Sequence, residues 1–339
     1  MDIHQSIPLK NYTTMKLGGD ARFMTEVRTP EEVQAICKNS KSQNLPIFIL
    51  GGGSNTIVRD QGFDGIVVRI RIPGLEVVAD DLYSTTVKVG AGEIWDEFVA
   101  WSVEHKLTGI EAMSAIPGTV GAAPVQNIGA YGQEVADSIV ELEAYDTESD
   151  QFVTLKSQDC QFAYRSSIFR EEFIGRYVIV SVTFSLSKNL PQPPFYAALQ
   201  KYFDENHVTT FLHETVRQAV IAIRADKLPD PTERPNAGSF FKNAVIDDWL
   251  LPDLQAEYPD IPFYDMPGKR YKIPSGWLIE QAGFKGQFIS GMRVHDKNAL
   301  VLINESAKSY ADLEIARDKI TTGVRDKFRI ELEQEPLEL

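Results

Sequence analysis

The sequence predicts an α+β fold, on three observations. Residues 1–70 alternate strand-like and helix-like runs, as a small β-α-β-β unit does. The middle of the chain is rich in strand-like runs, and the part after residue 230 mixes helix-like runs with one strongly apolar strand. At 339 residues the chain is long enough for two or three domains.

The first unit begins with a predicted strand over 21–29. Thr29-Pro30-Glu31-Glu32 then supplies an N-cap, a proline at the first helical position and a capping-box glutamate, which predicts a helix over 30–41. Strands are predicted at 46–50 and 65–71, with Gly51-Gly52-Gly53 directly after the first of them.

The remaining elements follow from periodicity. An apolar stripe predicts a helix over 93–106, and proline-rich stretches at 190–195 and 227–235 predict irregular connections, with a domain boundary near 230. The tail from Phe328 alternates and is able to rejoin a sheet. Strands are predicted at 74–79, 84–89, 140–146, 152–156, 177–186 and 299–303, and helices at 245–258, 275–282 and 308–327.

Composition excludes several classes of function. The chain is 43% hydrophobic and 24% charged, as globular proteins are, and its net charge of -14 argues against nucleic acid and anionic membranes as partners. An anionic substrate therefore needs a local basic pocket. The two cysteines, Cys37 and Cys160, do not form a zinc motif, and we predict reduced buried thiols and no metal. The first residues lack the pattern of a secretion signal, which predicts a cytoplasmic protein.

Two glycine-rich segments are candidate ligand sites. Gly51, Gly52, Gly53, Ser54 and Asn55 follow a strand, and their backbone N–H groups can cradle a pyrophosphate. The segment does not match G-x-G-x-x-G, so a Rossmann site is not supported. A tight strand-ending turn is an equally good interpretation of this segment taken alone.

The second segment, IPGTVGAAPVQNIGAYGQE at 116–134, is uncharged between its bracketing glutamates and dense in small residues. Small residues allow the backbone to approach a flat ligand closely, and a large polar cofactor can satisfy the backbone of a buried loop. A closely packed connecting loop is the alternative. Two such segments in one chain favour a bound dinucleotide.

Seven segments, spread along nearly the whole chain, carry a resemblance to one family. They are NYTTMKLGG (11–19), GGGSN (51–55), IPGTVGAAPVQNIGAYGQE (116–134), YRSSIF (164–169), KLPDP (227–231), NAGSFFKN (236–243) and GWLIEQ (276–281). In these segments the chain resembles the UDP-N-acetylenolpyruvoylglucosamine reductase family, and the segment around PPFYAALQKYF resembles its longer, type I form. The resemblance implies an FAD-binding region of the vanillyl-alcohol-oxidase type, made of residues 1–70 with the C-terminal strand 329–339 and of residues 71–228, and a substrate domain at 229–328.

The resemblance also implies the reaction. NADPH reduces bound FAD, and the reduced flavin passes hydride to the enolpyruvyl ether of UDP-N-acetylglucosamine, which gives UDP-N-acetylmuramate for peptidoglycan. The implied cofactor contacts are Gly51, Gly52, Gly53, Ser54, Asn55, Pro117, Gly118, Gly121, Ala122, Asn127, Gly129, Ala130 and Tyr131. The implied substrate contacts are Tyr196, Lys227, Asn243 and Asn298.

Three residues match the family's catalytic positions. Arg165 presents a permanently charged planar fork suited to a carboxylate on which negative charge develops. Ser239, in a glycine-flanked turn, matches the general acid that protonates the intermediate. Glu335 matches the glutamate that supports the carboxylate end. The chain departs from the family pattern after this residue, with Pro336 and an end at Leu339, so Glu333 is the fallback assignment.

Other interpretations stay open. Taken alone, Arg165 suits a surface salt bridge, Ser239 a turn that caps a backbone amide, and Glu335 a solvated tail. An FAD-linked sugar or alcohol oxidase of the same superfamily is a second enzyme hypothesis, and NAGSFFKN argues against it. A catalytically inactive nucleotide-sugar binding protein is a third, although such a protein has no chemical need for Arg165 and Ser239. We expect a monomer.

Overall fold

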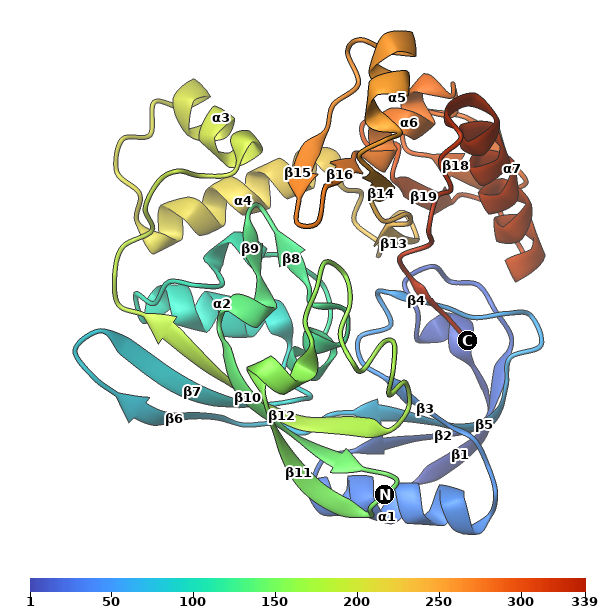
Figure 1. Cartoon of the computed structure of the whole chain (residues 1–339). Helices are drawn as coiled ribbons and strands as arrows, with labels where there is room; N and C mark the ends of the chain where they lie inside the picture. Colours follow the sequence, from blue (N-terminus) through green and yellow to red (C-terminus); the bar gives the residue numbers. More distant parts are fainter. The chain divides into compact units, whose positions relative to one another are not determined.

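The computed structural model describes all 339 residues, which form two compact units (Figure 1). The first contains Met1–Ile7, Ala21–Gly53 and Phe63–Ala225, and the second contains Pro8–Asp20, Ser54–Gly62 and Asp226–Leu339. Both units combine helices with sheets, so the predicted α+β class is confirmed. The finer division of the FAD-binding region at residue 70 stays a prediction.

A small sheet with a crossover helix opens the first unit. Its strand order is β1-β2-β5-β3, and β2 and β3 both pair parallel to β5. Helix α1 (Pro30–Ser42) joins β2 to β3, and Thr29 Oγ1 accepts a hydrogen bond from the Glu32 N–H at 3.2 Å, which confirms the predicted cap. The strands are β1 (Ile3–Pro8), β2 (Asp20–Val27), β3 (Ile47–Leu50) and β5 (Phe63–Ile70).

A five-stranded antiparallel sheet forms the rest of the first unit's core. Its order is β11-β10-β12-β7-β6, and helix α2 (Trp95–Glu104) packs against it through Phe98, whose ring centroid lies 4.9 Å from that of Phe184. The predicted strand-rich region is confirmed. The strands are β6 (Leu75–Asp80), β7 (Ser84–Gly90), β10 (Ile139–Asp146), β11 (Gln151–Lys156) and β12 (Tyr177–Ser187).

Two helices close the first unit. Helices α3 (Ala197–Glu205) and α4 (His213–Lys227) share a separate apolar cluster. Phe203, near the end of α3, and Val220 of α4 are fully buried in this cluster, so the two helices share one apolar core.

The second unit has one main core between short sheets and three helices. Its sheets have the orders β13-β19-β18-β17, β14-β16-β15 and β20-β4. The helices are α5 (Leu251–Glu257), α6 (Ser275–Gln281) and α7 (Tyr310–Phe328). The strands are β4 (Thr56–Ile57), β13 (Asn236–Ser239), β14 (Ala244–Asp247), β15 (Tyr264–Met266), β16 (Arg270–Ile273), β17 (Phe288–Ile289), β18 (Met292–Val294), β19 (Val301–Asn304) and β20 (Leu337–Glu338).

The prediction of a helix over 245–258 was wrong in its first half. Residues 245–258 were expected to form a single helix, but β14 occupies the start of this stretch and only α5 is helical. Val245 is exposed and Ile246 is buried opposite Tyr271 of β16, so burial alternates as in a strand. A short apolar run cannot be assigned by periodicity alone, and here the partner strand decides it.

The C-terminus is folded. Helix α7 begins at a capping box in which Ser309 Oγ accepts from the Asp312 N–H, and it ends at Arg329 in the left-handed region. The last residues then form β20, which pairs parallel to β4. None of the helices has both the length and the apolar character that crossing a bilayer requires.

Candidate active site

The two glycine-rich segments meet in the first unit. A Cβ atom added to Gly52 would lie 2.8 Å from the Cα of Gly118, and one added to Gly51 would lie 3.0 Å from Ala122 Cβ and from Thr119 Oγ1. At Gly52, backbone therefore lies directly against backbone, which only glycine permits, and at Gly51 the nearest atoms are side-chain atoms of the same segment. The structure thus brings together Gly51, Gly52, Gly118 and Ala122, which the sequence predicted separately.

The segment at 116–134 folds as short turns and a two-stranded hairpin. Its turning point is Asn127, which is 1% exposed and has a φ of 46°. The Asn127 side chain donates to Glu134 Oε2 at 2.7 Å and to the Ala163 carbonyl at 3.2 Å, and accepts from the Ala136 N–H at 3.1 Å. This side chain holds the loop in shape. The hairpin consists of β8 (Gly129–Ala130) and β9 (Gln133–Glu134).

Arg165 lies against this loop. It sits in a tight turn closed by hydrogen bonds between Ala163 and Ser166, with a φ of 53°. Its Nη2 donates to the Gly129 carbonyl at 2.9 Å and its Nη1 to the Asn127 carbonyl at 3.5 Å. A non-glycine residue in the left-handed region is uncommon and often found at functional sites. The guanidinium is therefore held by the same segment that was predicted to contact the cofactor.

Tyr131 and Tyr196 also come together in the first unit. Their ring centroids are 6.2 Å apart, edge to face, and Tyr196 precedes α3 and is 47% exposed. The pKa of Tyr131 is raised because the ring is buried, although the positive charge of Arg224 opposes this. The residue predicted to meet the cofactor thus contacts the residue predicted to meet the substrate.

Arg224 is a basic residue that the sequence analysis did not single out. Burial lowers the pKa of its guanidinium, Tyr131 and Asp96 oppose that effect, and the charge of Arg165 adds to it. Its Nε is buried without a hydrogen-bond partner in the protein. A half-buried cation of this kind fits an anionic ligand. The only signal in the sequence is its place one helical turn before Lys227, which does not reveal burial.

In the second unit, Ser239 and Glu335 lie on neighbouring backbone segments. The Glu335 N–H donates to the Phe240 carbonyl at 2.9 Å, and the Lys242 N–H donates to the Glu333 carbonyl at 2.9 Å. Phe241 and Gln334 form an antiparallel bridge between these bonds. Ser239, the last residue of β13, is therefore beside the segment that carries Glu335.

The two candidate glutamates differ in environment. Glu335 is 9% exposed, whereas the side chain of Glu333 is 69% exposed and its carboxylate pairs with Lys242 Nζ. The two side chains lie two residues apart, and it is their burial, not strand alternation, that distinguishes them. The buried position belongs to Glu335, which is the one also bonded to the backbone next to Ser239.

Two predicted substrate residues flank the start of α6. Asn243 Oδ1 accepts from the Ser275 N–H at 3.1 Å. A Cβ on Gly276 would lie 3.9 Å from Asn298 Oδ1, which itself accepts from the Leu300 N–H at 3.2 Å. Lys227, at the end of α4, is exposed. The Asn55 carbonyl accepts from the Leu337 N–H at 2.9 Å, which ties the predicted cofactor loop to β20.

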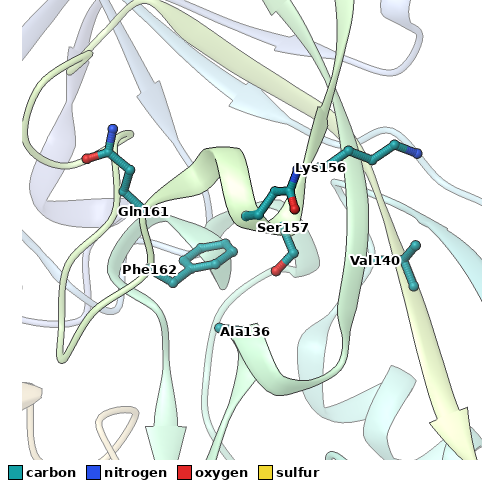
Figure 2. A pocket seen from close by; sticks show the side chains of 7 residues that line it. Ala136, Val140, Lys156, Ser157, Gln161 and Phe162 are labelled. Carbon is teal, nitrogen blue, oxygen red and sulfur yellow. The ribbon is translucent and has the colours of Figure 1, made fainter.

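A separate open pocket of ≈ 680 Å³ lies in the first unit (Figure 2). None of the predicted site residues lines it. Gln161 and Phe162 come from the segment that precedes the Arg165 turn, and Figure 2 shows both with Ala136 among the residues that line the pocket. The other lining residues are Val140, Lys156, Ser157 and Gln158. Lys156 Nζ pairs with Glu141, so the cation at its rim is already neutralised.

Comparison with known proteins defines the class. The sequence model of the FAD binding domain family matches residues 21–155, the part of the chain that contains both glycine-rich segments. The close contact of Gly51 and Gly52 with the second glycine-rich segment and the neighbouring guanidinium groups fit such a cofactor, and the protein is a flavin oxidoreductase.

The model of the UDP-N-acetylenolpyruvoylglucosamine reductase C-terminal domain matches residues 230–338. The chain is 40% identical over 333 residues to the UDP-N-acetylenolpyruvoylglucosamine reductase of Ralstonia nicotianae, covering 97% of each chain. It is 38% identical over 342 residues to that of Dechloromonas aromatica, with 99% of each chain covered. The chain therefore belongs to the UDP-N-acetylenolpyruvoylglucosamine reductase family.

A solved structure shares the fold. The crystal structure of UDP-N-acetylenolpyruvylglucosamine reductase from Thermus caldophilus matches with a TM-score of 0.67 at 23% identity, over 100% of this chain and 99% of that one. At this identity the likeness describes the fold. It covers both units of the chain.

Proposed function

We propose that this protein reduces UDP-N-acetyl-3-O-(1-carboxyvinyl)glucosamine to UDP-N-acetylmuramate with NADPH, through bound FAD, as a step of peptidoglycan synthesis. The observation that supports the assignment of roles is the hydrogen bond from the Glu335 N–H to the Phe240 carbonyl, which brings the backbone of the buried residue Glu335 next to the segment that carries Ser239. Family membership supports the substrate. We expect a cytoplasmic monomer whose product serves the cell wall, and thereby cell shape and division.

FAD fits the glycine-rich contact in the first unit. Gly51 to Gly53, with Ser54 and Asn55, offer successive backbone N–H groups to a pyrophosphate, and Gly118 and Ala122 present a surface without bulky side chains to a flat ring. When bound, FAD accepts hydride from NADPH and supplies it to the substrate. The other cofactor contacts that the resemblance implies are proposed on the same ground: Pro117, Gly121, Asn127, Gly129, Ala130 and Tyr131.

Arg165 is proposed to hold the substrate carboxylate. When hydride adds to the β-carbon, the electron pair of the carbon–carbon double bond moves toward this carboxylate, which gains negative charge. A fixed guanidinium stabilises that charge without reorganising, and it cannot lose its proton. The bond to the Gly129 carbonyl at 2.9 Å fixes its direction in advance. Arg224, which interacts electrostatically with Arg165, adds a second positive charge.

Ser239 is proposed to donate the proton that completes the reaction. The α-carbon of the intermediate needs a proton, and the Ser239 hydroxyl provides one and recovers it from water. Gly238 precedes it with a φ of 70° and no atom near its missing Cβ, so the turn presents Ser239 without obstruction. Glu335 is proposed to support the carboxylate end of the intermediate from the adjacent backbone segment.

The nucleotide diphosphate needs local donors in a chain of net charge -14. Tyr196 and Lys227 are exposed, and the amide side chains of Asn243 and Asn298 flank the first turn of α6. We propose these four residues as diphosphate contacts. Hydrogen bonds to phosphate from such groups give orientation as well as affinity.

The test is a turnover assay in D2O with product analysis. The proposal predicts that, without oxygen, NADPH is consumed beyond one equivalent per flavin only when the enolpyruvyl substrate is present, and that UDP-N-acetylmuramate forms with deuterium at the α-carbon. Consumption of NADPH with oxygen alone, or oxidation of a free sugar, would instead indicate an oxidase. Binding of the nucleotide sugar without NADPH consumption would indicate an inactive binding protein.

A further inference from the structure

The C-terminal tail is held by one arginine of α7. Arg317 Nη1 donates to Gln334 Oε1 at 3.3 Å and to Glu338 Oε2 at 3.2 Å. These two residues flank Glu335 in the sequence. Arg317 Nη2 also donates to Glu314 Oε1 at 3.2 Å and Arg317 Nε to Asp318 Oδ1 at 3.0 Å, both on the same helix. These bonds fix the orientation of the guanidinium group.

Glu338 is the second anchor of this cluster. Tyr310 donates to its Oε2 at 2.8 Å, and Arg59 Nε donates to its Oε1 at 2.6 Å. Burial raises the pKa of Glu338, but the hydrogen bonds from Tyr310 and Arg59 outweigh burial and the pKa lies below its ordinary value. Glu338 is therefore a carboxylate at neutral pH, and it accepts hydrogen bonds from Arg59, Tyr310 and Arg317.

The cluster formed by Arg317, Glu338, Tyr310 and Arg59 lies at the end of the chain, where few backbone hydrogen bonds hold the last residues. The final strand β20 has two residues, and chain ends of this length fray unless they are tied down. The side chains of Arg317 and Glu338 are 21% and 19% exposed, so solvent screens their interaction less than it screens a surface ion pair. Gln334 Nε2 also donates to the Pro336 carbonyl at 3.0 Å, which closes the turn around Glu335.

We propose that Arg317 is a positioning residue for Glu335. Arg317 hydrogen-bonds to Gln334 and Glu338, on either side of Glu335 in the sequence. These bonds thereby fix the position of Glu335 relative to Ser239. This inference rests on the proposed function, in which Glu335 acts on the intermediate. Arg317 itself does not touch the substrate, so it is required for the substrate half of the reaction and not for reduction of the flavin by NADPH.

The test is a double-mutant cycle of Arg317→Met and Glu335→Gln, with the two half-reactions measured separately by stopped-flow. Arg317→Met is expected to slow reoxidation of the flavin by substrate about tenfold, because a carboxylate displaced by about 1 Å loses much of its effect. Flavin reduction by NADPH should change less than about twofold. In the Glu335→Gln background, Arg317→Met should add less than about twofold, since residues that act through one another are not additive.

Arg325→Met is the matched control. Arg325 lies on the same helix, its side chain is 50% exposed, and it pairs with Asp326 and Glu331 and with none of residues 334–339. Hydrogen exchange gives a readout independent of activity. The amides of residues 334–339 should exchange faster in Arg317→Met and unchanged in Arg325→Met, and Arg317→Lys should restore part of the protection.

Additive effects in the cycle, or equal slowing of both half-reactions, would overturn the proposal. So would unchanged exchange of the tail in Arg317→Met. If Arg317→Met does not fold, Glu338→Gln removes the acceptor side of the same contact and is predicted to give the same cycle. Failure of the wild-type protein to reduce the enolpyruvyl substrate would instead contradict the proposed function, and hydrogen exchange would still report whether Arg317 holds the tail.

Discussion

The backbone N–H of Glu335 donates to the carbonyl of Phe240 at 2.9 Å. The buried glutamate is therefore paired with the residue that directly follows Ser239. Residues almost a hundred positions apart in the sequence are thereby placed with the precision of a sheet contact. If Ser239 is the acid, as proposed, we expect it and the Glu335 carboxylate to need little movement to reach the same substrate group.

Replacing Ser239 by alanine should slow the second half-reaction far more than the first, because only the substrate half needs a carbon acid. We expect at least about a hundredfold loss in flavin reoxidation by substrate and little change in flavin reduction. Stopped-flow absorbance separates the two steps. Ser306→Ala, an exposed serine of the same unit, is the matched control. Equal slowing of both halves by Ser239→Ala would remove this residue from proton donation.

Replacing Arg165 by lysine should damage turnover while FAD stays bound. Lysine keeps the charge but loses the planar fork that matches a carboxylate, and we expect kcat to fall by about tenfold or more. Flavin content is measured from the visible spectrum of the purified variant. Loss of the flavin from Arg165→Lys would mean that the arginine shapes the loop at 129 and has no chemical role.

A methyl group at Gly52 should expel the cofactor. Its Cβ would lie 2.8 Å from the Gly118 Cα, closer than backbone can accommodate, so the two glycine-rich segments must separate. Gly52→Ala is expected to be purified with little FAD. Gly276→Ala, whose Cβ would make an ordinary contact of 3.4 Å with Leu300, should retain the flavin. Full occupancy in Gly52→Ala would argue that the cofactor is held elsewhere.

The two cysteines should resist thiol reagents in the native protein. Burial raises the pKa of Cys37 to about 12, with a further contribution from Asp150, and burial together with Asp159 raises the pKa of Cys160 to about 12. At about pH 8 the reactive thiolate is then a fraction on the order of one in ten thousand. A chromogenic disulfide reagent should detect no thiol before denaturation and both thiols after it. Rapid labelling of the native protein would contradict this.

Asp146 should stabilise the first unit except in acid. Its carboxylate accepts from Arg176 Nε at 2.9 Å and Nη2 at 2.8 Å, and these bonds outweigh burial and hold its pKa well below its usual range. A carboxyl whose pKa is lower in the folded state stabilises the fold above its unfolded pKa of about 4, and this contribution is lost as the pH falls below that value. Asp146→Asn should cost about 2 kcal/mol at neutral pH.

Denaturant unfolding of wild type and Asp146→Asn from about pH 7 to pH 3 measures this difference. The gap in the free energy of unfolding should narrow below about pH 4. Asp64→Asn is the control, since the Asp64 side chain is 86% exposed in its pair with Arg22 and should contribute less than about 0.5 kcal/mol. A gap that stays constant in acid would show that Asp146 acts by shape and not by charge.

Local chemistry made most elements predictable. The cap at Thr29 lies within four residues of its partner, and the strands of the first unit carry their own periodicity. The stretch at 245–258 was predicted wrongly because its strand depends on β16, which lies more than twenty residues away. Pairing of distant segments overrides local preference in such cases.

The site shows the same limit. Glu335 could not be separated from Glu333 by sequence, because the choice depends on the bond to Phe240. Arg224 and Arg317 look like ordinary helical basic residues until burial and the tail contacts are known. The roles of these residues stay predictions.

The most direct measurement is the anaerobic visible spectrum of the purified protein, recorded alone, after one equivalent of NADPH, and after adding UDP-N-acetylenolpyruvoylglucosamine. We predict a flavin band that bleaches with NADPH and returns, without oxygen, when the substrate is added. A band that NADPH bleaches but the substrate does not restore would contradict the proposed reaction, and a protein without a flavin band would contradict the cofactor as well.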